Sequence, residues 1–487
     1  MLLAKEGKRV LLLEQHSIPG GYCTSYRRHG FTFNIPSVMT SISEGELSSV
    51  LGDLGFFDEI EFVELDDFAK YVYPDLEVIM PANNLEGCRE NLKEVFPSEK
   101  SAIDKIFSEI TRHQTVPFSF TGNRRSARSI ISFLFTISKL ILGSRISFYA
   151  YMKRFTDDER LIEILSGLWV FTGLPSKSTP AIFHLMLTGE CYGKPTFIPR
   201  EGFQAVSNFL AKKFVEYSGE IKYRTKVSRI LIKDSRAIGV LTSDDNEYHS
   251  DSIISNADSR KTFLDLVGRQ HLPAKFISRI NVHRTSASGI SLQIGTSLDL
   301  SRFDLRYGNV FYHESWEDSN SYYDKAVANK VDFEMDNIPL SLQASSLFSD
   351  RLAPNGMNIL HILLFPVSSS YKNNFGVING ERGEDYKRIK DQISNILIRK
   401  AEKIIPGLKD SIILKELSTP FTFERFTGAT DGAWYDGVFS INDKQQKPSS
   451  HTPIKNLYIT GTKAFGGAGL PSALNGGIKT AKTILSK

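Results

Sequence analysis

Two neighbouring stretches decide the fold, KRVLLLE at residues 8–14 and SIPGGYCTS at residues 17–25. Residues 2–6 have the pattern of a last helical turn, and Gly7 is typical of the residue that ends a helix. The run at 8–14 is continuously apolar before its final acid, which is typical of a buried strand in a parallel sheet. The order of helix and strand predicts that the chain begins inside a βαβ unit.

The acid at the end of this strand, Glu14, suggests a nucleotide site. Dinucleotide-binding folds place an acid here to bind the hydroxyls of the adenosine ribose, and a carboxylate would repel a 2′-phosphate. FAD or NAD is therefore favoured over NADP. The paired Gly20 and Gly21 that follow allow the backbone to pass close to a ligand. The competing interpretations are an ordinary charged strand end and a plain turn.

Three blocks of the sequence together resemble one family. Glu14 followed by x5-GG-x2-T is similar to the second half of the FAD fingerprint in the amine oxidase and phytoene desaturase superfamily. Residues 199–258 resemble the central stretch of that family, in which the residue matching Val227 offers its backbone to adenine. Residues 456–477 resemble the C-terminal flavin motif. Its small residues let a helix N-terminus approach the flavin ring, where the dipole favours the negative charge of the reduced form.

The chain is thus identified as a member of the phytoene desaturase, carotenoid isomerase and retinol saturase group. The resemblance implies an α/β fold: a Rossmann-like, glutathione-reductase-type FAD-binding domain with an inserted α+β substrate domain. We expect the FAD-binding domain at residues 1–65, 195–268 and 441–487, and the substrate domain at residues 66–194 and 269–440. The implied cofactor is FAD, with Glu14, Gly20, Gly21, Val227, Gly461, Thr462, Gly469 and Leu470 as the binding residues.

Two positions depart from the family pattern. The GxGxxG loop normally lies about 20 residues before the acid, whereas 13 residues precede Glu14. We therefore expect the first strand of the domain to be absent, through a start assigned too late or a fragment. Thr462 stands where many relatives have an acid that binds the ribityl chain. A hydroxyl can still make one hydrogen bond, and the departure favours a retinol saturase-like subgroup.

Composition argues against several kinds of partner, bound metal and targeting segment. A net charge of +4 over 487 residues, without a dense basic run, argues against a nucleic-acid partner. Cys23, Cys88 and Cys191 are far apart and show neither a disulfide framework nor metal-ligand spacing. The N-terminus lacks the pattern of a signal peptide, and the apolar stretch at 130–142 is too short to span a bilayer. We expect a cytoplasmic protein without a metal site.

A basic, acid-free stretch at residues 121–154 interleaves arginine and lysine with phenylalanine, isoleucine and leucine. That composition predicts peripheral attachment to a membrane, from which a lipid-dissolved substrate is taken. An internal helical subdomain is the competing interpretation. Trp434 and Tyr435 are candidates for lining a polyene channel, and the alternative for both is an ordinary place in the core.

The favoured hypothesis is an FAD-dependent oxidoreductase that desaturates or saturates C–C bonds of a carotenoid-, retinoid- or other isoprenoid-like substrate. One alternative is a polyene cis–trans isomerase that uses reduced FAD, and another is a truncated, non-catalytic fragment or pseudoenzyme. The sequence nominates no catalytic residue. It leaves open the substrate, the reaction direction, the electron acceptor and the oligomeric state.

Overall fold

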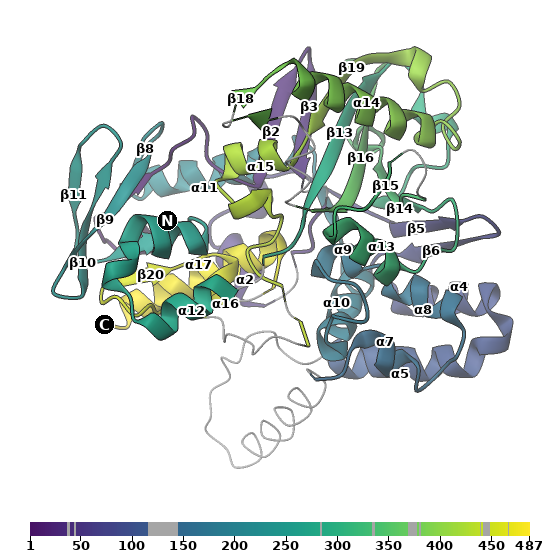
Figure 1. Cartoon of the computed structure of the whole chain (residues 1–487), viewed down its shortest axis with the longest axis horizontal. Helices are drawn as coiled ribbons and strands as arrows, with labels where there is room; N and C mark the ends of the chain where they lie inside the picture. Colours follow the sequence, from purple (N-terminus) through teal and green to yellow (C-terminus); the bar gives the residue numbers. More distant parts are fainter. Residues whose placement is uncertain are drawn as a thin grey trace.

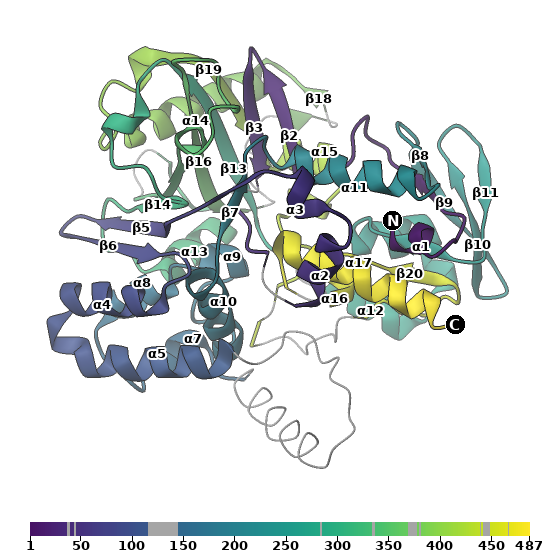
Figure 2. The ribbon, with the colours of Figure 1, turned by 180° about the vertical axis from the view of Figure 1, so that it is seen from behind.

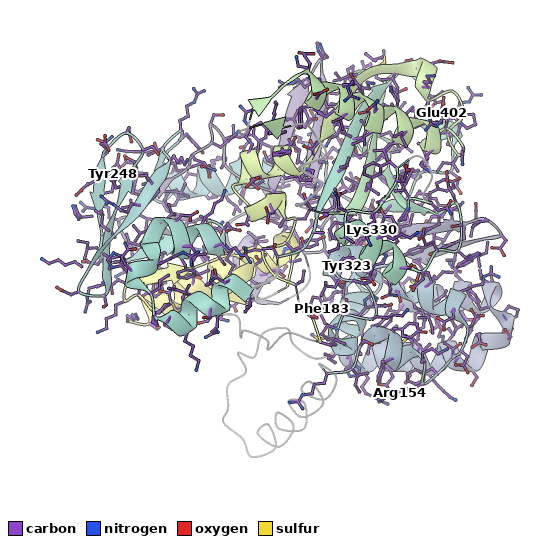
Figure 3. All side chains as sticks on the ribbon, viewed as in Figure 1. Arg154, Phe183, Tyr248, Tyr323, Lys330 and Glu402 are labelled. Carbon is purple, nitrogen blue, oxygen red and sulfur yellow. The ribbon has the colours of Figure 1, made fainter. Side chains whose placement is uncertain are left out.

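The computed structural model describes residues 1–36, 39–42, 45–114, 145–282, 285–333, 337–368, 377–378, 381–438, 440–441, 449–465 and 467–487. They form two lobes that lie side by side in both views (Figures 1 and 2). One lobe carries short strands near the two termini, and the other carries a large sheet above a layer of helices. Figure 3 shows Tyr248 and Glu402 at opposite ends of this arrangement.

The first lobe is built on two parallel strand pairs. After helix α1 (Leu2–Lys5) and Gly7, whose φ is +74°, strand β1 (Leu11–Leu13) pairs with β8 (Glu220–Lys222). Strand β12 (Ile253–Ser255) pairs with β20 (Leu457–Ile459). Within the described residues each pair is a two-stranded sheet, and Leu12 and Ile254 are 41% and 38% exposed. The expected buried strand at 8–14 is therefore shorter and partly exposed, because it has a partner on one side only.

An antiparallel meander and several helices complete this lobe. Strands β9 (Val227–Lys233), β10 (Arg236–Thr242) and β11 (Glu247–His249) form a three-stranded sheet. Strand β8 is not part of this sheet, because it pairs with β1. A turn in which the Ser250 hydroxyl donates to the Ser252 carbonyl separates β11 from β12. The helices are α11 (Gln204–Glu216), the π-helix η2 (Lys261–Gly268), α12 (Ala274–Val282), α16 (Thr462–Phe465) and α17 (Gly469–Leu485).

The second lobe centres on a seven-stranded sheet in the order β19-β13-β16-β15-β14-β5-β6. Only β14 and β5 run parallel to each other. The strands are β19 (Ile412–Ser418), β13 (Ser288–Thr296), β16 (Asn358–Val367), β15 (Leu340–Gln343), β14 (Asn309–Tyr312), β5 (Asp67–Tyr73) and β6 (Leu76–Pro81). Strands β13 and β16 are neighbours inside this sheet and are buried along almost their whole length.

Each face of this sheet has its own cover. Helices α13 (Ser319–Val327) and α14 (Glu384–Ala401) pack on one face against an apolar cluster that includes Leu292, Leu342 and Ile362. The hairpin of β2 (Cys23–Arg28) and β3 (Phe31–Pro36) packs on the other face, where Gly295 leaves room for the Phe31 ring. The chain after β1 therefore crosses from the first lobe to the sheet of the second.

A helical layer covers the β5 and β6 end of the sheet. It consists of α4 (Leu85–Val95), α5 (Lys100–Gln114), α7 (Phe148–Met152), α8 (Glu159–Ser166), α9 (Trp169–Thr172) and α10 (Ala181–Gly193). Between the lobes lie α2 (Glu46–Gly52), α3 (Phe56–Glu59), α15 (Pro420–Thr427) and the antiparallel pair β4 (Phe62–Glu64) and β7 (Phe197–Pro199). The short pair β17 (Val377–Ile378) and β18 (Glu381–Arg382) precedes α14.

The predicted membrane segment at 121–154 lies outside the described residues except for its end at 145–154. There the Phe148 side chain is buried and stacks on His184, and Lys153 forms ion pairs with Asp157 and Glu159. Phe148 therefore packs inside the helical layer, whereas the Lys153 ion pairs lie on its exposed side. In the described part of the chain, no helix is both long and apolar enough to cross a membrane.

Candidate functional site

Four segments meet where the two lobes join. They are the loop after β1 at residues 14–22, the residues after β12 at 256–259, the loop at 429–436, and, between β20 and α17, helix α16 with its described flanking residues at 461–465 and 467–469. The Tyr22 hydroxyl donates to the Ala433 carbonyl at 2.7 Å, and the Thr430 hydroxyl donates to Asp258 Oδ1 at 2.7 Å. Lys463 Nζ lies 3.3 Å from Asp436 Oδ2. The loop at 429–436 therefore fastens the other three together.

The residues around Glu14 form one side of this junction. Glu14 accepts a hydrogen bond from the backbone N–H of His16 at 2.7 Å, so the carboxylate is held near the turn that follows the strand. Its backbone carbonyl accepts from Thr225 N–H at 2.9 Å, which brings Val227 at the start of β9 close to it. Val227 also packs against the apolar cluster of this lobe. Glu14 and Val227 therefore lie on neighbouring segments of the same lobe, and their roles in cofactor binding stay predictions.

Glycines are required where the backbone segments approach most closely. A Cβ atom at Gly20, whose φ is +128°, would lie 2.3 Å from the Cys23 carbonyl oxygen and 2.6 Å from Ser207 Oγ. A Cβ atom at Gly476 would lie 1.8 Å from the carbonyl oxygen of Gly461. These distances exclude any larger residue without movement of the backbone. The glycines therefore let the turn after β1 reach α11 and let α17 lie directly on the end of β20.

The C-terminal residues of the prediction lie at the start of two helices. Thr462 begins α16, and Gly469 and Leu470 begin α17. Leu470 and Cys23 pack against the same apolar cluster. This cluster therefore holds the N-terminus of α17 and the residues after Gly21 close to each other. The predicted residues therefore form two groups, one around Glu14 and one around Gly461, that meet at the junction.

Three charged residues at this junction received no role from the sequence. Burial alone would raise the pKa of Asp258, but hydrogen bonds from Lys261 and Thr430 and the charge of Lys463 lower it below its usual value. Asp436 accepts hydrogen bonds from the Ser259 N–H and hydroxyl. Lys463 also donates to the Ala257 carbonyl. Asp258 belongs to a quoted block, whereas nothing in the sequence singled out Lys463 or Asp436, because their pairing depends on tertiary contact.

Aromatic side chains connect the junction to the large sheet. Trp434 stacks on Phe365 of β16 with ring centroids 5.3 Å apart, and it covers Gly289 of β13, where a Cβ atom would lie 2.2 Å from its ring. The Tyr435 hydroxyl donates to the Val170 carbonyl at 3.0 Å. Both side chains are packed inside the protein, and a role for them in lining a substrate channel stays a prediction.

Comparison with known proteins reveals extended similarity. A family model described as flavin containing amine oxidoreductase matches residues 2–272, more than half of the chain. The prolycopene isomerase of Daucus carota is 26% identical, covering 99% of this chain and 77% of its own length. The all-trans-retinol 13,14-reductase of Danio rerio is 25% identical, and the match covers 100% of this chain and 84% of the reductase. The lycopene-forming phytoene desaturase of Pseudescherichia vulneris is 23% identical, and the match covers 99% of this chain and 95% of the desaturase.

Two solved structures show the same fold over the whole chain. An oxidoreductase from Methanosarcina mazei superposes with a TM-score of 0.64 at 17% identity, covering 100% of this chain and 96% of that one. Putrescine oxidase bound to putrescine also has a TM-score of 0.64, at 13% identity, with 100% and 95% covered. At these identities the likeness establishes the fold alone.

Proposed function

Because this chain belongs to the flavin containing amine oxidoreductase family, we propose that it oxidises or reduces C–C bonds of a carotenoid-, retinoid- or other isoprenoid-like substrate. The chain is an FAD-dependent oxidoreductase of the phytoene desaturase, carotenoid isomerase and retinol saturase group. The predicted Rossmann-like α/β fold is confirmed by the solved relatives. The single observation that supports the substrate class is the full-length similarity to three enzymes named for polyene substrates.

The junction residues fit an FAD molecule. Glu14 retains a carboxylate oxygen beyond the one bonded to His16, which suits a ribose hydroxyl. Gly20 and Gly21 adopt positive φ, and at Gly21 a Cβ atom would meet nothing within 4 Å, so a ligand could approach the backbone there. The N-terminus of α17 begins at Gly469 and supplies free N–H groups to an electron-rich ring edge. We assign the eight predicted residues to FAD on these grounds.

When bound, FAD would accept a hydride from an allylic C–H bond in desaturation, and reduced FAD would donate one to a C=C bond in saturation. The chain's own residues position the reactants, because such a transfer needs orientation more than side-chain acid or base chemistry. The loop at 429–436 is held on the proposed cofactor side by Asp258, Asp436 and Lys463. Trp434 of this loop packs on Phe365 of the large sheet.

Peripheral attachment to a membrane is part of the same proposal. An isoprenoid-like substrate dissolves in lipid, and residues 121–144, the larger part of the basic segment, lie outside the described residues. Flotation with vesicles of neutral lipid and of lipid containing about one third anionic headgroups tests this step. We expect binding to the anionic vesicles that falls as salt rises. Failure to float with either vesicle would contradict it.

Polyene cis–trans isomerisation is the second candidate function. It is favoured by the similarity to a plant prolycopene isomerase over 99% of this chain. The two reactions differ in mass, since desaturation or saturation changes the hydrogen count of the product and isomerisation does not. Mass spectrometry of products formed with oxidised and with reduced FAD therefore separates them.

Flavin binding itself is the first test of the proposed function. The purified chain, and a longer form that includes any in-frame upstream GxGxxG segment, are each incubated with FAD and freed of unbound cofactor. We expect the protein to retain flavin that absorbs at about 450 nm, as enzyme-bound oxidised flavins do. If neither form retains flavin, the enzyme proposal fails and a non-catalytic pseudoenzyme takes its place.

A further inference from the structure

A row of polar side chains crosses the large sheet on the face that carries the β2-β3 hairpin. In the strand register, Glu416 of β19 lies opposite Gln293 of β13, Gln293 opposite His361 of β16, and His361 opposite Gln343 of β15. Gln293, His361 and Gln343 are each no more than 1% exposed. Because side chains of paired residues point to the same face, all four stand on one face of the sheet.

This row is out of place in an ordinary core. The neighbouring residues on the opposite face, such as Leu292 and Ile362, are apolar and pack under α13 and α14. Burying an amide or imidazole costs free energy unless it is hydrogen-bonded. Gln293 meets that condition, because its amide reaches the Glu416 carbonyl and the Ser291 hydroxyl, each at 2.8 Å.

His361 does not meet it. Both ring nitrogens, Nδ1 and Nε2, are buried and have no hydrogen-bond partner among the residues that the structure describes. The contact that faces the ring is Phe33 of β3, with centroids 6.0 Å apart. Burial lowers the pKa of His361 to about 4, so the imidazole is neutral at physiological pH and offers one donor and one acceptor.

The same sheet face leads to the junction. Gln293 lies 3.4 Å from the Tyr26 hydroxyl, on the strand that continues from Gly20 and Gly21. Four residues before Gln293 in β13, Gly289 lies beneath Trp434, whose indole N–H is also buried and has no hydrogen-bond partner in the described part of the chain. A second buried polar group without a partner therefore lies where the loop at 429–436 meets β13.

We propose that His361, supported by Gln293 and Gln343, binds a hydroxyl or carbonyl group of the substrate. The inference rests on the proposed function and sharpens it: the substrate is an isoprenoid-like molecule with a polar end group, preferred over a pure hydrocarbon. A site that is built to hydrogen-bond a substrate hydroxyl rejects the analogue that lacks it, because the buried partners are then left unpaired.

The test compares two ligands that differ in one group, all-trans-retinol and the analogue in which CH3 replaces its CH2OH. Each is titrated into the flavin-loaded protein in detergent micelles, and binding is followed by quenching of tryptophan fluorescence. We expect the hydroxylated ligand to bind at least about 10-fold more tightly. His361→Phe should bring the ratio close to one while the hydrocarbon still binds, and His361→Gln, which keeps hydrogen-bonding atoms, should retain part of the preference.

His184 provides the matched control. It is also fully buried with a pKa lowered by burial to about 4, but it lies in α10, where Nε2 is 3.1 Å from the Leu165 carbonyl. His184→Phe should leave the ligand ratio unchanged. Equal binding of the two ligands to the natural protein, or an unchanged ratio in His361→Phe, overturns the inference and leaves the proposed function in place. If neither ligand binds to flavin-loaded protein, the proposed substrate class falls with it.

Discussion

At the scale of single residues, two neighbouring glycines in α17 should respond in opposite ways to alanine. A Cβ atom at Gly476 would overlap the Gly461 carbonyl, whereas a Cβ atom at Gly477 would meet nothing within 4 Å. We predict that Gly476→Ala destabilises the fold by about 1–3 kcal/mol, as overpacking does, and weakens FAD binding. Gly477→Ala should stabilise the helix by about 0.5–1 kcal/mol. Urea unfolding and FAD titration measure both; equal effects would contradict the close approach.

Glu163 gives a pH dependence. Burial raises its pKa to about 7, although it accepts hydrogen bonds from the Ser319 N–H and hydroxyl. Asp318 also raises this pKa, and Lys177 opposes it. The pKa of Glu163 is higher in the folded protein than in the unfolded chain. Its contribution to the free energy of unfolding is therefore fully present below about pH 4.5, and it is lost as pH rises through about 7.

The corresponding variant is Glu163→Gln. It removes the titration, so its stability relative to the natural protein should rise between pH 5 and pH 8, by up to about 3 kcal/mol. Thermal unfolding at several pH values measures the difference. Glu159→Gln, an exposed ion-paired neighbour on the same helix, is the control and should show no such trend. A parallel response of both variants would refute the assignment.

At the scale of elements, the loop at 429–436 is held by Asp258. Its carboxylate accepts from the Thr430 N–H and hydroxyl and from the Lys261 N–H. Asp258→Ala leaves these donors without a partner and should cost about 1–3 kcal/mol, with a clear loss of FAD affinity. Asp251→Ala, at an exposed acid just before β12, serves as control. Retention of full FAD affinity in Asp258→Ala would show that this loop does not support the cofactor side.

The sequence predicted the elements whose signals are local. The amphipathic pattern of residues 203–217 and the alternating apolar runs at 62–80 and 357–366 are local signals, and the observed helix and strands lie close to these bounds because periodicity and turn residues determine them. The pairing of β8 with β1 has no such signal, because a three-residue strand has no period of its own. Glu14 and the glycines were found by their spacing, whereas the junction of Asp258, Asp436 and Lys463 depends on contacts between residues 172, 177 and 206 positions apart. The division into domains and the roles of the eight residues stay predictions.

At the scale of the whole molecule, FAD should stabilise the entire chain. The proposed binding residues come from both ends and the middle of the sequence, so FAD would bind only when these segments are folded together. At FAD concentrations about 100 times the Kd, the gain is about 2.7 kcal/mol. A melting temperature that rises with FAD concentration in the natural protein, and much less in Gly476→Ala, checks this. No dependence on FAD would contradict cofactor binding to the folded state.

The strand pairs β1-β8 and β12-β20 also affect how the molecule behaves in concentrated solution. Within the described residues β1 pairs with β8 alone and β12 with β20 alone, and Leu12 of β1 and Ile254 of β12 are exposed. An unpaired strand edge flanked by apolar side chains is a template on which a strand of another molecule can add. The protein is therefore prone to concentration-dependent aggregation through these edges, and a lysine at position 12 or 254 would improve its solubility without touching the large sheet.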